Sequence, residues 1–327
     1  MQLRVWEIES DIEAKQFDAS LEKYRFRERC AVLQQPLTLV EVWCRYCEFK
    51  TPQWAETTVI LHINRISKHI EALPFQKLSD ANDILMYLIK TQSQDTTCRI
   101  LAEIKASCNW AFKSKLITSN PFADISFKPP KAKPTIDPFT PAETLAIIQA
   151  FESTHYGNFV KFLFMTGCRS SEAFGLKWKN VTPDHILFSE ARVKNIQKGT
   201  KTGLSRRFPC NDALRSLLDD MRSDVKPDAL VFTSPSGTSI NSNNFINNHW
   251  KGRRGRHGII PQLIAEGKVY RYRPQYNTRH TFITHCIASG IPVPTVASWV
   301  GNSPEIIFKH YCGISPHSTP SLLSLTT

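Results

Sequence analysis

Four short stretches of the sequence carry residue types that could do phosphate chemistry. The first reads MTGCRSSEAFGLKW and holds Cys168, Arg169 and a glutamate at one helix start. It is open to three interpretations: a nucleophile site, an anion clamp, or an ordinary amphipathic helix with a polar cap. The first turn of a helix has unpaired N–H groups at the positive end of its dipole, and Arg169 adds a planar guanidinium suited to phosphate. Cys168 would need a partner that stabilises its thiolate, and the neighbouring sequence provides none.

The other three stretches supply a lysine, a second arginine and a tyrosine. Lys201 lies in a glycine-flanked turn between two predicted strands, within QKGTKTGLSRRFPC. Arg279 follows Tyr276 by about one helical turn in YRYRPQYNTRHTFITHCIASG. Tyr311 lies on a short predicted helix in ASWVGNSPEIIFKHYCG. A lysine on a hairpin tip is usually solvated, but here it could reach a scissile phosphate and protonate a leaving oxygen.

Together these residue types suit cleavage of a phosphodiester through a covalent intermediate. Two arginines can neutralise the non-bridging oxygens as charge builds in the transition state. A tyrosine can attack as nucleophile and divide the reaction into two easier transfers. This chemistry predicts no cofactor and no metal site. Arg169 and Arg279 are 110 positions apart, so spacing alone leaves open whether they converge.

The composition favours a polyanionic partner. The 327 residues include 41 Lys and Arg against 29 Asp and Glu, a formal net charge of +12, which favours nucleic acid ahead of an anionic membrane surface. No run of 18 apolar residues occurs, and the first residues, MQLRVWEIESD, are acidic where a signal peptide would be apolar. The nine cysteines are odd in number and scattered. We therefore expect a cytoplasmic protein, associated with the nucleoid through DNA, with no membrane partner.

The pattern of segments predicts two domains joined by a basic linker. Residues 1–36 are polar, with a short helical piece around ESDIEAKQFDASLEKYRFRERC. Four helix-length apolar patterns predict a compact helical domain at 37–126. Prolines alternate with lysines in the linker, 127–139. A capping box opens the last domain, 140–327, which includes a C-terminal tail and shows no βαβ alternation. The predicted class is α+β, mainly α.

The last domain is expected to combine several helices with a few short strands. Strands are predicted at HILFS and RRFP and in the hairpin between them. Helices are expected at about 141–152, 157–166, 211–223, 242–250, 276–289, 293–300 and 304–311, besides the one that opens at Arg169.

Two basic segments are expected to contact the DNA backbone. One is the linker, and the other runs from Trp250 to Pro274, which otherwise reads as a solvated loop. Such contacts add affinity and salt dependence without sequence information. The residues predicted to make them are Lys128, Lys131, Lys133, Arg253, Arg254, Arg256, Arg271 and Arg273.

In order along the chain, the four stretches resemble the motifs of the tyrosine recombinases, the phage integrase family. GCRSSEA followed by LKW resembles the first-arginine box, and TKT resembles the β-hairpin lysine. RHTF resembles the second-arginine box, and GNS, with Asn302 nine residues before Tyr311, resembles the last box and its nucleophile. The resemblance covers about 37–313. IEAKQFDASLEKY also resembles the tail of an arm-type region, so 1–36 could be a remnant of one.

The resemblance implies a site-specific DNA recombinase. It implies a four-helix core-binding (SAM-like) domain and a catalytic domain of the DNA breaking–rejoining type with a small antiparallel sheet. Tyr311 would form a 3′-phosphotyrosyl link without a metal, and strand exchange would pass through a Holliday junction. The implied partners are double-stranded DNA, three further copies of the chain in a tetramer on that DNA, and accessory factors that bend DNA or set direction.

Two positions depart from the family's pattern. The first member of its H-x-x-R motif is Tyr276 here, and its later His or Trp is Asn302. Both side chains can donate hydrogen bonds to a phosphate oxygen, so both are predicted catalytic residues. Neither is a good base at neutral pH, which leaves open what activates Tyr311. For His280 we expect a structural role, bonded to a backbone group, and His310 should point away from Tyr311.

Two alternative functions stay open. The chain could be a catalytically impaired DNA-binding regulator of recombination, degenerate at the two departing positions. It could also be a nicking-closing enzyme like a type IB topoisomerase, which shares this chemistry. The presence of Arg169, Lys201, Arg279 and Tyr311 favours the recombinase. The first stretch is then an anion clamp, in which Arg169 grips the scissile phosphate and the serines cap the helix.

Overall fold

The computed structural model describes residues 2–18, 36–128, 136–193, 196–199, 205–222, 225–253 and 255–312. The chain divides into two compact units, Met1–Lys131 and Ala132–Thr327, and this division falls inside the predicted linker. Helix α1 (Gln2–Glu13) begins earlier than the helical piece predicted from the sequence. In the described residues, no helix combines the length and the apolar character needed to cross a membrane.

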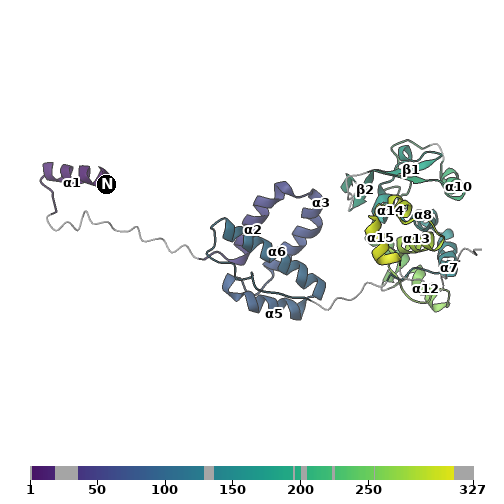
Figure 1. Ribbon diagram of the computed structural model, residues 1–327, viewed down its shortest axis with the longest axis horizontal. Helices are drawn as coiled ribbons and strands as arrows, with labels where there is room; N and C mark the ends of the chain where they lie inside the picture. The colour runs from purple at the N-terminus through teal and green to yellow at the C-terminus, as the bar shows by residue number, and fades with distance from the viewer. Residues whose placement is uncertain are drawn as a thin grey trace, which may run out of the picture. The chain divides into compact units, whose positions relative to one another are not determined.

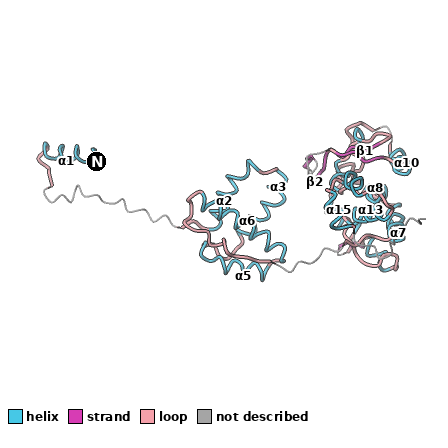
Figure 2. Tube along the Cα trace, in the orientation of Figure 1, coloured by secondary structure: helices cyan, strands magenta, loops and turns pink. Residues whose placement is uncertain are grey.

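Helices α2 to α6 of the first unit lie together (Figures 1 and 2), and α2, α4, α5 and α6 bury apolar side chains in one core. A capping box starts α2, because Thr38 Oγ1 accepts from Glu41 N (3.2 Å) while Glu41 Oε2 accepts from Thr38 N (2.7 Å). Trp43 is buried in the core, and its Nε1 donates to Ser67 Oγ (2.9 Å). Each of the four predicted helical segments forms a helix. The elements are α2 (Leu39–Lys50), α3 (Glu56–Thr58) continuing through a π-helical turn (Val59–Ile63) into α4 (Asn64–Glu71), α5 (Ala81–Thr91) and α6 (Gln94–Lys113).

In the second unit (Figure 1), α8 packs against α7, α9, α10 and α13, and most of its residues are buried. Phenylalanines dominate its core; Phe159 stacks on Phe174, and Phe162 packs at an angle on Phe232. Helix α13 packs against α8 and α14, and α15 packs against α14 and α13. The helices are α7 (Pro141–Glu152), α8 (Gly157–Thr166), α9 (Ser170–Gly175), α10 (Asp212–Met221), α11 (Ser242–Phe245), α12 (Ile259–Ala265), α13 (Asn277–Ala288), α14 (Val293–Val300) and α15 (Pro304–Tyr311).

Short antiparallel strands complete the second unit. β1 (His185–Phe188) pairs with β4 (Arg206–Pro209), and β2 (Glu190–Val193) pairs with β3 (Ile196–Gly199). The predicted strands are therefore confirmed, and so is the mainly helical α+β class. Lys201 follows β3 and lies outside the described residues.

The segment read as a solvated loop, Trp250–Pro274, contains regular structure. A two-residue hairpin, β5 (Gly252–Arg253) and β6 (Arg256–His257), is followed by α12. Helix α12 turns Ile260 and Leu263, three residues apart, into the core. The alternative interpretation of this segment as a solvated loop is wrong, because α12 also packs Ile259 and Ile264 against the core.

Candidate active site

The site forms where two helices end at glycines in the left-handed conformation. α8 ends at Gly167 (φ +57°) and α14 ends at Gly301 (φ +66°). A Cβ at Gly167 would lie 2.4 Å from the ring of Phe282, so glycine is required there by its backbone angle and by space. Arg169 and Asn302 follow these glycines closely. The carbonyl ends of both helices therefore face the same cluster of side chains.

Arg279, from α13, satisfies the carbonyls at these two helix ends. Its Nη1 donates to Gly167 O (2.8 Å) and its Nη2 donates to Val300 O (2.7 Å). Helix C-termini leave such carbonyls unpaired and carry partial negative charge, so a guanidinium is favoured there. Burial, and then the charge of Arg169, lower the pKa of Arg279 from its ordinary value. With 1% of its surface exposed, Arg279 is held rigidly in the interior.

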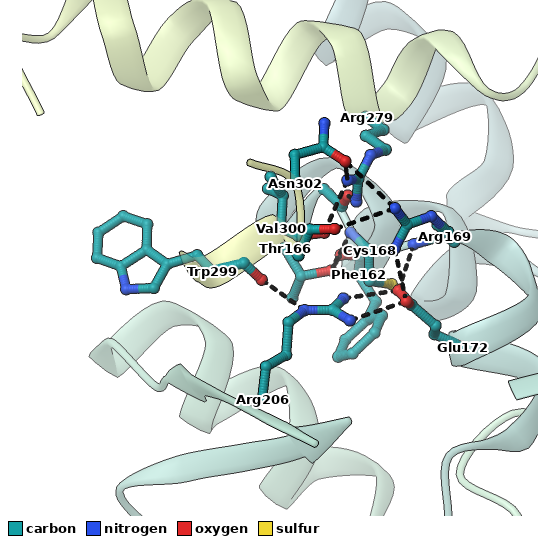
Figure 3. A network of polar contacts seen from close by, with 12 residues as sticks. Phe162, Thr166, Cys168, Arg169, Glu172, Arg206, Arg279, Trp299, Val300 and Asn302 are labelled. Carbon is teal, nitrogen blue, oxygen red and sulfur yellow. Dashed lines mark hydrogen bonds and ion pairs between the residues drawn. The ribbon is translucent and has the colours of Figure 1, made fainter. Parts of the chain in front are cut away.

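Asn302 joins the two arginines. Its Oδ1 accepts from Arg169 Nη2 (3.2 Å) and from Arg279 Nη2 (3.0 Å), as Figure 3 shows. Arg169 Nη2 also donates to Gly301 O (3.2 Å). Three residues predicted from three separate stretches thus converge on one point. The Nδ2 group of Asn302, on the other branch of its amide, keeps N–H groups that can donate to a phosphate.

A buried carboxylate, Glu172, organises the same cluster. It is 2% exposed and accepts from Arg169 N (2.8 Å), Arg169 Nη1 (3.1 Å), and Arg206 Nη1 and Nη2 (2.8 and 2.6 Å). Burial raises the pKa of Glu172, but the paired bonds and charge of Arg206, with those of Arg169, outweigh it and hold the pKa below its usual range. Glu172 is therefore a carboxylate with four donors.

Arg206, on β4, was missed by the sequence analysis. Besides its two bonds to Glu172, its Nε donates to Trp299 O (2.8 Å), and its guanidinium lies 4.5 Å from the centroid of the Phe188 ring. It links the strand that follows Lys201 to the end of α14 (Figure 3). The spacing of a capping box identifies Glu172, at the third position after Arg169, but no local pattern in the sequence pairs Arg206 with it.

The predicted serine cap of α9 is wrong. Arg169 is the N-cap residue, and Glu172 accepts from its backbone N–H. Ser170 instead donates through Oγ to Gln275 Oε1 (2.7 Å). Cys168 is buried, and burial raises its pKa to about 12, so it is not a nucleophile at neutral pH.

Tyr311 ends α15 and meets a histidine of α13. Its Oη lies 2.6 Å from His280 Nδ1. The prediction that His280 bonds a backbone group was wrong, because α15 packs on α13 and brings the tyrosine hydroxyl to the ring. Tyr276, one turn earlier, packs edge-to-face on His280 with ring centroids 5.2 Å apart. His310 is exposed.

The two partners have protonation states that suit proton transfer. Burial raises the pKa of Tyr311 to about 12, although the charge of Arg279 opposes this. Burial, followed by the charges of Arg279 and His310, lowers the pKa of His280 below 6.5. At neutral pH the phenol therefore carries its proton and the imidazole is free to accept one.

The basic residues predicted to contact DNA differ in exposure. Arg253 and Arg256 are exposed and pair across the β5–β6 hairpin, and Lys128 is exposed too. Arg271 is 58% exposed, and its Nε donates to Asp137 Oδ2 (2.9 Å). Three of the predicted DNA contacts lie outside the described part of the chain, namely Lys131, Lys133 and Arg254, and so does the predicted catalytic residue Lys201.

The prediction of a DNA contact is wrong for Arg273. Its side chain is 6% exposed and bonds through Nε to Asp137 Oδ2 (2.6 Å) and through Nη1 to Glu143 Oε1 (2.9 Å). Its guanidinium also lies 4.9 Å from the centroid of the Phe139 ring. Arg273 is an interior ion-pair partner that fastens the start of the second unit to the segment before α13.

Comparison with known families agrees with this geometry. Residues 138–315, more than half of the chain, match the model of the phage integrase family. The chain belongs to this family. Among curated proteins, it is similar to the tyrosine recombinase XerD of Staphylococcus epidermidis, with 25% identity over 263 residues covering 78% of this chain and 83% of that protein. The XerD of Staphylococcus aureus is 24% identical over 255 residues, covering 76% and 81%.

Solved structures of family members share the fold. One is the Tn1549 transposon integrase in complex with a circular intermediate DNA, with TM-score 0.66, 17% identity, and coverage of 86% of this chain and 96% of that one. Another is a lambda integrase tetramer bound to a Holliday junction, with TM-score 0.62, 16% identity, and coverage of 89% and 86%. Family, relatives and fold together identify a tyrosine-type site-specific recombinase.

Proposed function

We propose that this chain cuts and rejoins duplex DNA at specific sites through a 3′-phosphotyrosyl link to Tyr311. The observation that carries the proposal is the hydrogen bond from the Tyr311 hydroxyl to His280, on the helix that also supplies Arg279. Arg279 in turn meets Arg169 at Asn302. A nucleophile with a basic partner, next to two guanidinium groups, is the arrangement that covalent phosphoryl transfer requires.

The arginines differ in the parts we assign to them. Arg169 is 26% exposed, so it can meet a non-bridging phosphate oxygen directly. Arg279 is buried and contributes positive charge from behind, in a place where few water molecules screen it. Asn302 Nδ2 and the half-exposed Tyr276 are proposed as further donors to the phosphate. Lys201 is proposed to protonate the departing 5′ oxygen. Because the two guanidinium groups neutralise the phosphate, we propose that no metal takes part.

The proposed partners are double-stranded DNA and other copies of this chain. Strand exchange joins two duplexes and uses four cleavage events, so the proposed assembly is a tetramer on DNA. The lambda integrase structure of the same fold is a tetramer on a Holliday junction, which supports this assembly. Accessory factors that bend DNA or set direction complete the proposal.

The proposal is tested by trapping the covalent intermediate. The substrate is a duplex from the ends of the genetic element that carries the gene, nicked so that cleavage releases a short fragment. We expect a protein–DNA adduct on a denaturing gel, formed equally in EDTA, and a protease digest whose DNA-linked peptide contains Tyr311. Binding without an adduct would favour a regulator that occludes sites. Relaxation of supercoils without strand exchange would favour a topoisomerase-like enzyme.

Removing the charge of Arg253 should weaken DNA binding mainly through salt dependence. Arg253 is exposed on the β5–β6 hairpin, so we expect it to displace one counterion from a phosphate. In Arg253→Ala, the slope of log K against log salt concentration should fall by about 1, with equal effect on specific and random duplexes. Arg253→Lys keeps the charge and should keep the slope. An unchanged slope in Arg253→Ala would place this hairpin away from the DNA.

A further inference from the structure

We propose that His280 is the general base that takes the proton of Tyr311, a role that the family's pattern does not assign to this position. The inference rests on the proposed function, because it concerns the same nucleophile. It is carried by one contact, the 2.6 Å distance between Tyr311 Oη and His280 Nδ1. At this distance the hydroxyl donates to the ring nitrogen in a hydrogen bond shorter than most.

The geometry of α13 explains why a histidine at position 280 can act as the base for Tyr311. Residues 276 and 280 are one turn apart, so they lie on the same face of α13. In this chain the position that the family's motif gives to histidine is Tyr276, whose ring packs on His280 at an interplanar angle of 74°. The imidazole of His280 lies one turn further along the helix than the position of the motif's histidine, next to the residue it must deprotonate.

The other groups near Tyr311 cannot take its proton at neutral pH. The amide of Asn302 does not titrate, and its Oδ1 is occupied by two arginines. Glu172 is buried and bound by four donors from Arg169 and Arg206. Among the described side chains, His280 is the group that combines contact with the hydroxyl and a free lone pair.

The proton inventory of the step balances. Tyr311 Oη forms a bond to phosphorus, and its proton passes to His280 Nδ1. The bond from phosphorus to the 5′ oxygen breaks, and that oxygen leaves with a proton from an acid, which we propose is Lys201. On rejoining, the 5′ hydroxyl gives its proton back to Lys201 as its oxygen bonds to phosphorus. The bond from phosphorus to Tyr311 Oη breaks, and the protonated His280 returns its proton to Tyr311.

The charges around His280 predict the direction of the pH dependence. Arg279 and Tyr276 face it from its own helix and N-cap, and Tyr311 and His310 face it from α15. Helix α14 carries no titratable side chain, and α8 carries only Lys161, which is exposed. Burial, followed by the charges of Arg279 and His310, disfavours protonation and lowers the pKa of His280, so the ring loses its accepting lone pair only below pH 6.5. The cleavage rate should then fall as the pH drops through that region.

The experiment compares single-turnover cleavage rates of the full chain on the nicked duplex across pH. His280→Gln retains a hydrogen-bond acceptor but cannot take a proton. We expect it to be about 10²–10⁴-fold slower than the wild type and to lose the acidic limb of the pH profile. Tyr276→Phe removes a proposed donor to the phosphate, so its rate should fall. It retains the ring that packs on His280, however, and should therefore keep the acidic limb of the pH profile. In His280→Ala, added imidazole should restore cleavage.

Different outcomes separate this inference from the function on which it rests. Without a Tyr311 adduct in the wild type, the proposed function itself fails. With that adduct present, a wild-type rate in His280→Gln, or a slower rate that keeps the acidic limb, overturns the role of His280 alone. In a substrate with sulfur at the 5′ bridging position, the thiolate leaves without needing a proton. Full rescue of His280→Gln cleavage on this substrate would therefore show that His280 acts as an acid and not as a base. If His280→Gln fails to bind DNA, the test rests on whether imidazole restores cleavage by His280→Ala. Failure of imidazole to restore cleavage overturns the inference.

Discussion

Tyr311→Phe is expected to bind the target duplex as tightly as the wild type and to form no covalent adduct. The variant lacks the oxygen that would attack phosphorus, while the phenyl ring keeps its packing against the cluster of α13 and α14. Removing the nucleophile of an enzyme that uses covalent catalysis lowers the rate by a factor on the order of 10⁴ or more. The loss should therefore be complete within the detection limit of a denaturing gel.

The matched control for this variant is Tyr270→Phe. It deletes the same atom from a tyrosine that is 84% exposed and lies outside the site, so its adduct should form at a normal rate. Binding of both variants is measured by fluorescence anisotropy on the unnicked duplex. If Tyr311→Phe still becomes linked to DNA, another residue is the nucleophile and the assignment of Tyr311 is wrong.

Glu172→Gln is expected to destabilise the second unit by about 3–5 kcal/mol, the usual cost of removing one partner of a buried ion pair. The variant leaves Arg206, whose side chain is 10% exposed, without a counter-charge. It also weakens the bond that starts α9 at Arg169. The measurement is a urea titration read by pulsed hydrogen–deuterium exchange of peptides from α8 and α9, which scores the second unit by itself. Cleavage should be lost as well, because Arg169 is no longer fixed.

A double variant separates the two effects on stability, that of the unpaired charge of Arg206 and that of the lost carboxylate. Glu172→Gln with Arg206→Met leaves no orphan guanidinium at this point, so it should be more stable than Glu172→Gln alone. Equal or lower stability would show that the ion pair is not the source of the effect.

The acid sensitivity of the fold should change with Glu172 in a defined direction. Its pKa in the folded chain is below the ordinary value of 4.5, so its contribution to stability is complete above pH 4.5 and is lost as the pH falls through the lower, folded pKa. The wild type should therefore lose stability in that acidic range more steeply than Glu172→Gln.

The sequence predicted those parts of the site that follow local rules. Arg169 and Asn302 come directly after helix ends, and each end is marked by a glycine that needs a positive φ. Caps and apolar periodicity also located α7, α8, α14 and α15 within about one residue. The convergence of Arg169, Arg279 and Asn302 came from the resemblance of the motifs, because spacing alone could not establish it.

The errors occurred where the partner of a residue is distant in sequence. Arg273 reads as a surface cation until Asp137, 136 positions earlier, is seen to neutralise it. Helix periodicity puts His280 on the face of Tyr276, but only the packing of α15 brings Tyr311 to it. The role of Arg206 likewise depends on β4 crossing the end of α14. In each case, a contact between residues far apart in the sequence sets the role of the side chain, and a local sequence pattern does not contain that contact.

The cluster in Figure 3 also links DNA binding to the cohesion of the folded chain. Arg169 and Arg206 bond the single carboxylate of Glu172, and Arg279 joins them through Asn302 Oδ1. Three guanidinium groups thus accompany one carboxylate, which leaves a formal excess of two positive charges. In the proposed complex, a DNA phosphate at this cluster would relieve the repulsion in the folded chain and do nothing comparable for the unfolded one. The phosphate would then serve as a structural counterion, and the second unit should be most rigid with DNA bound.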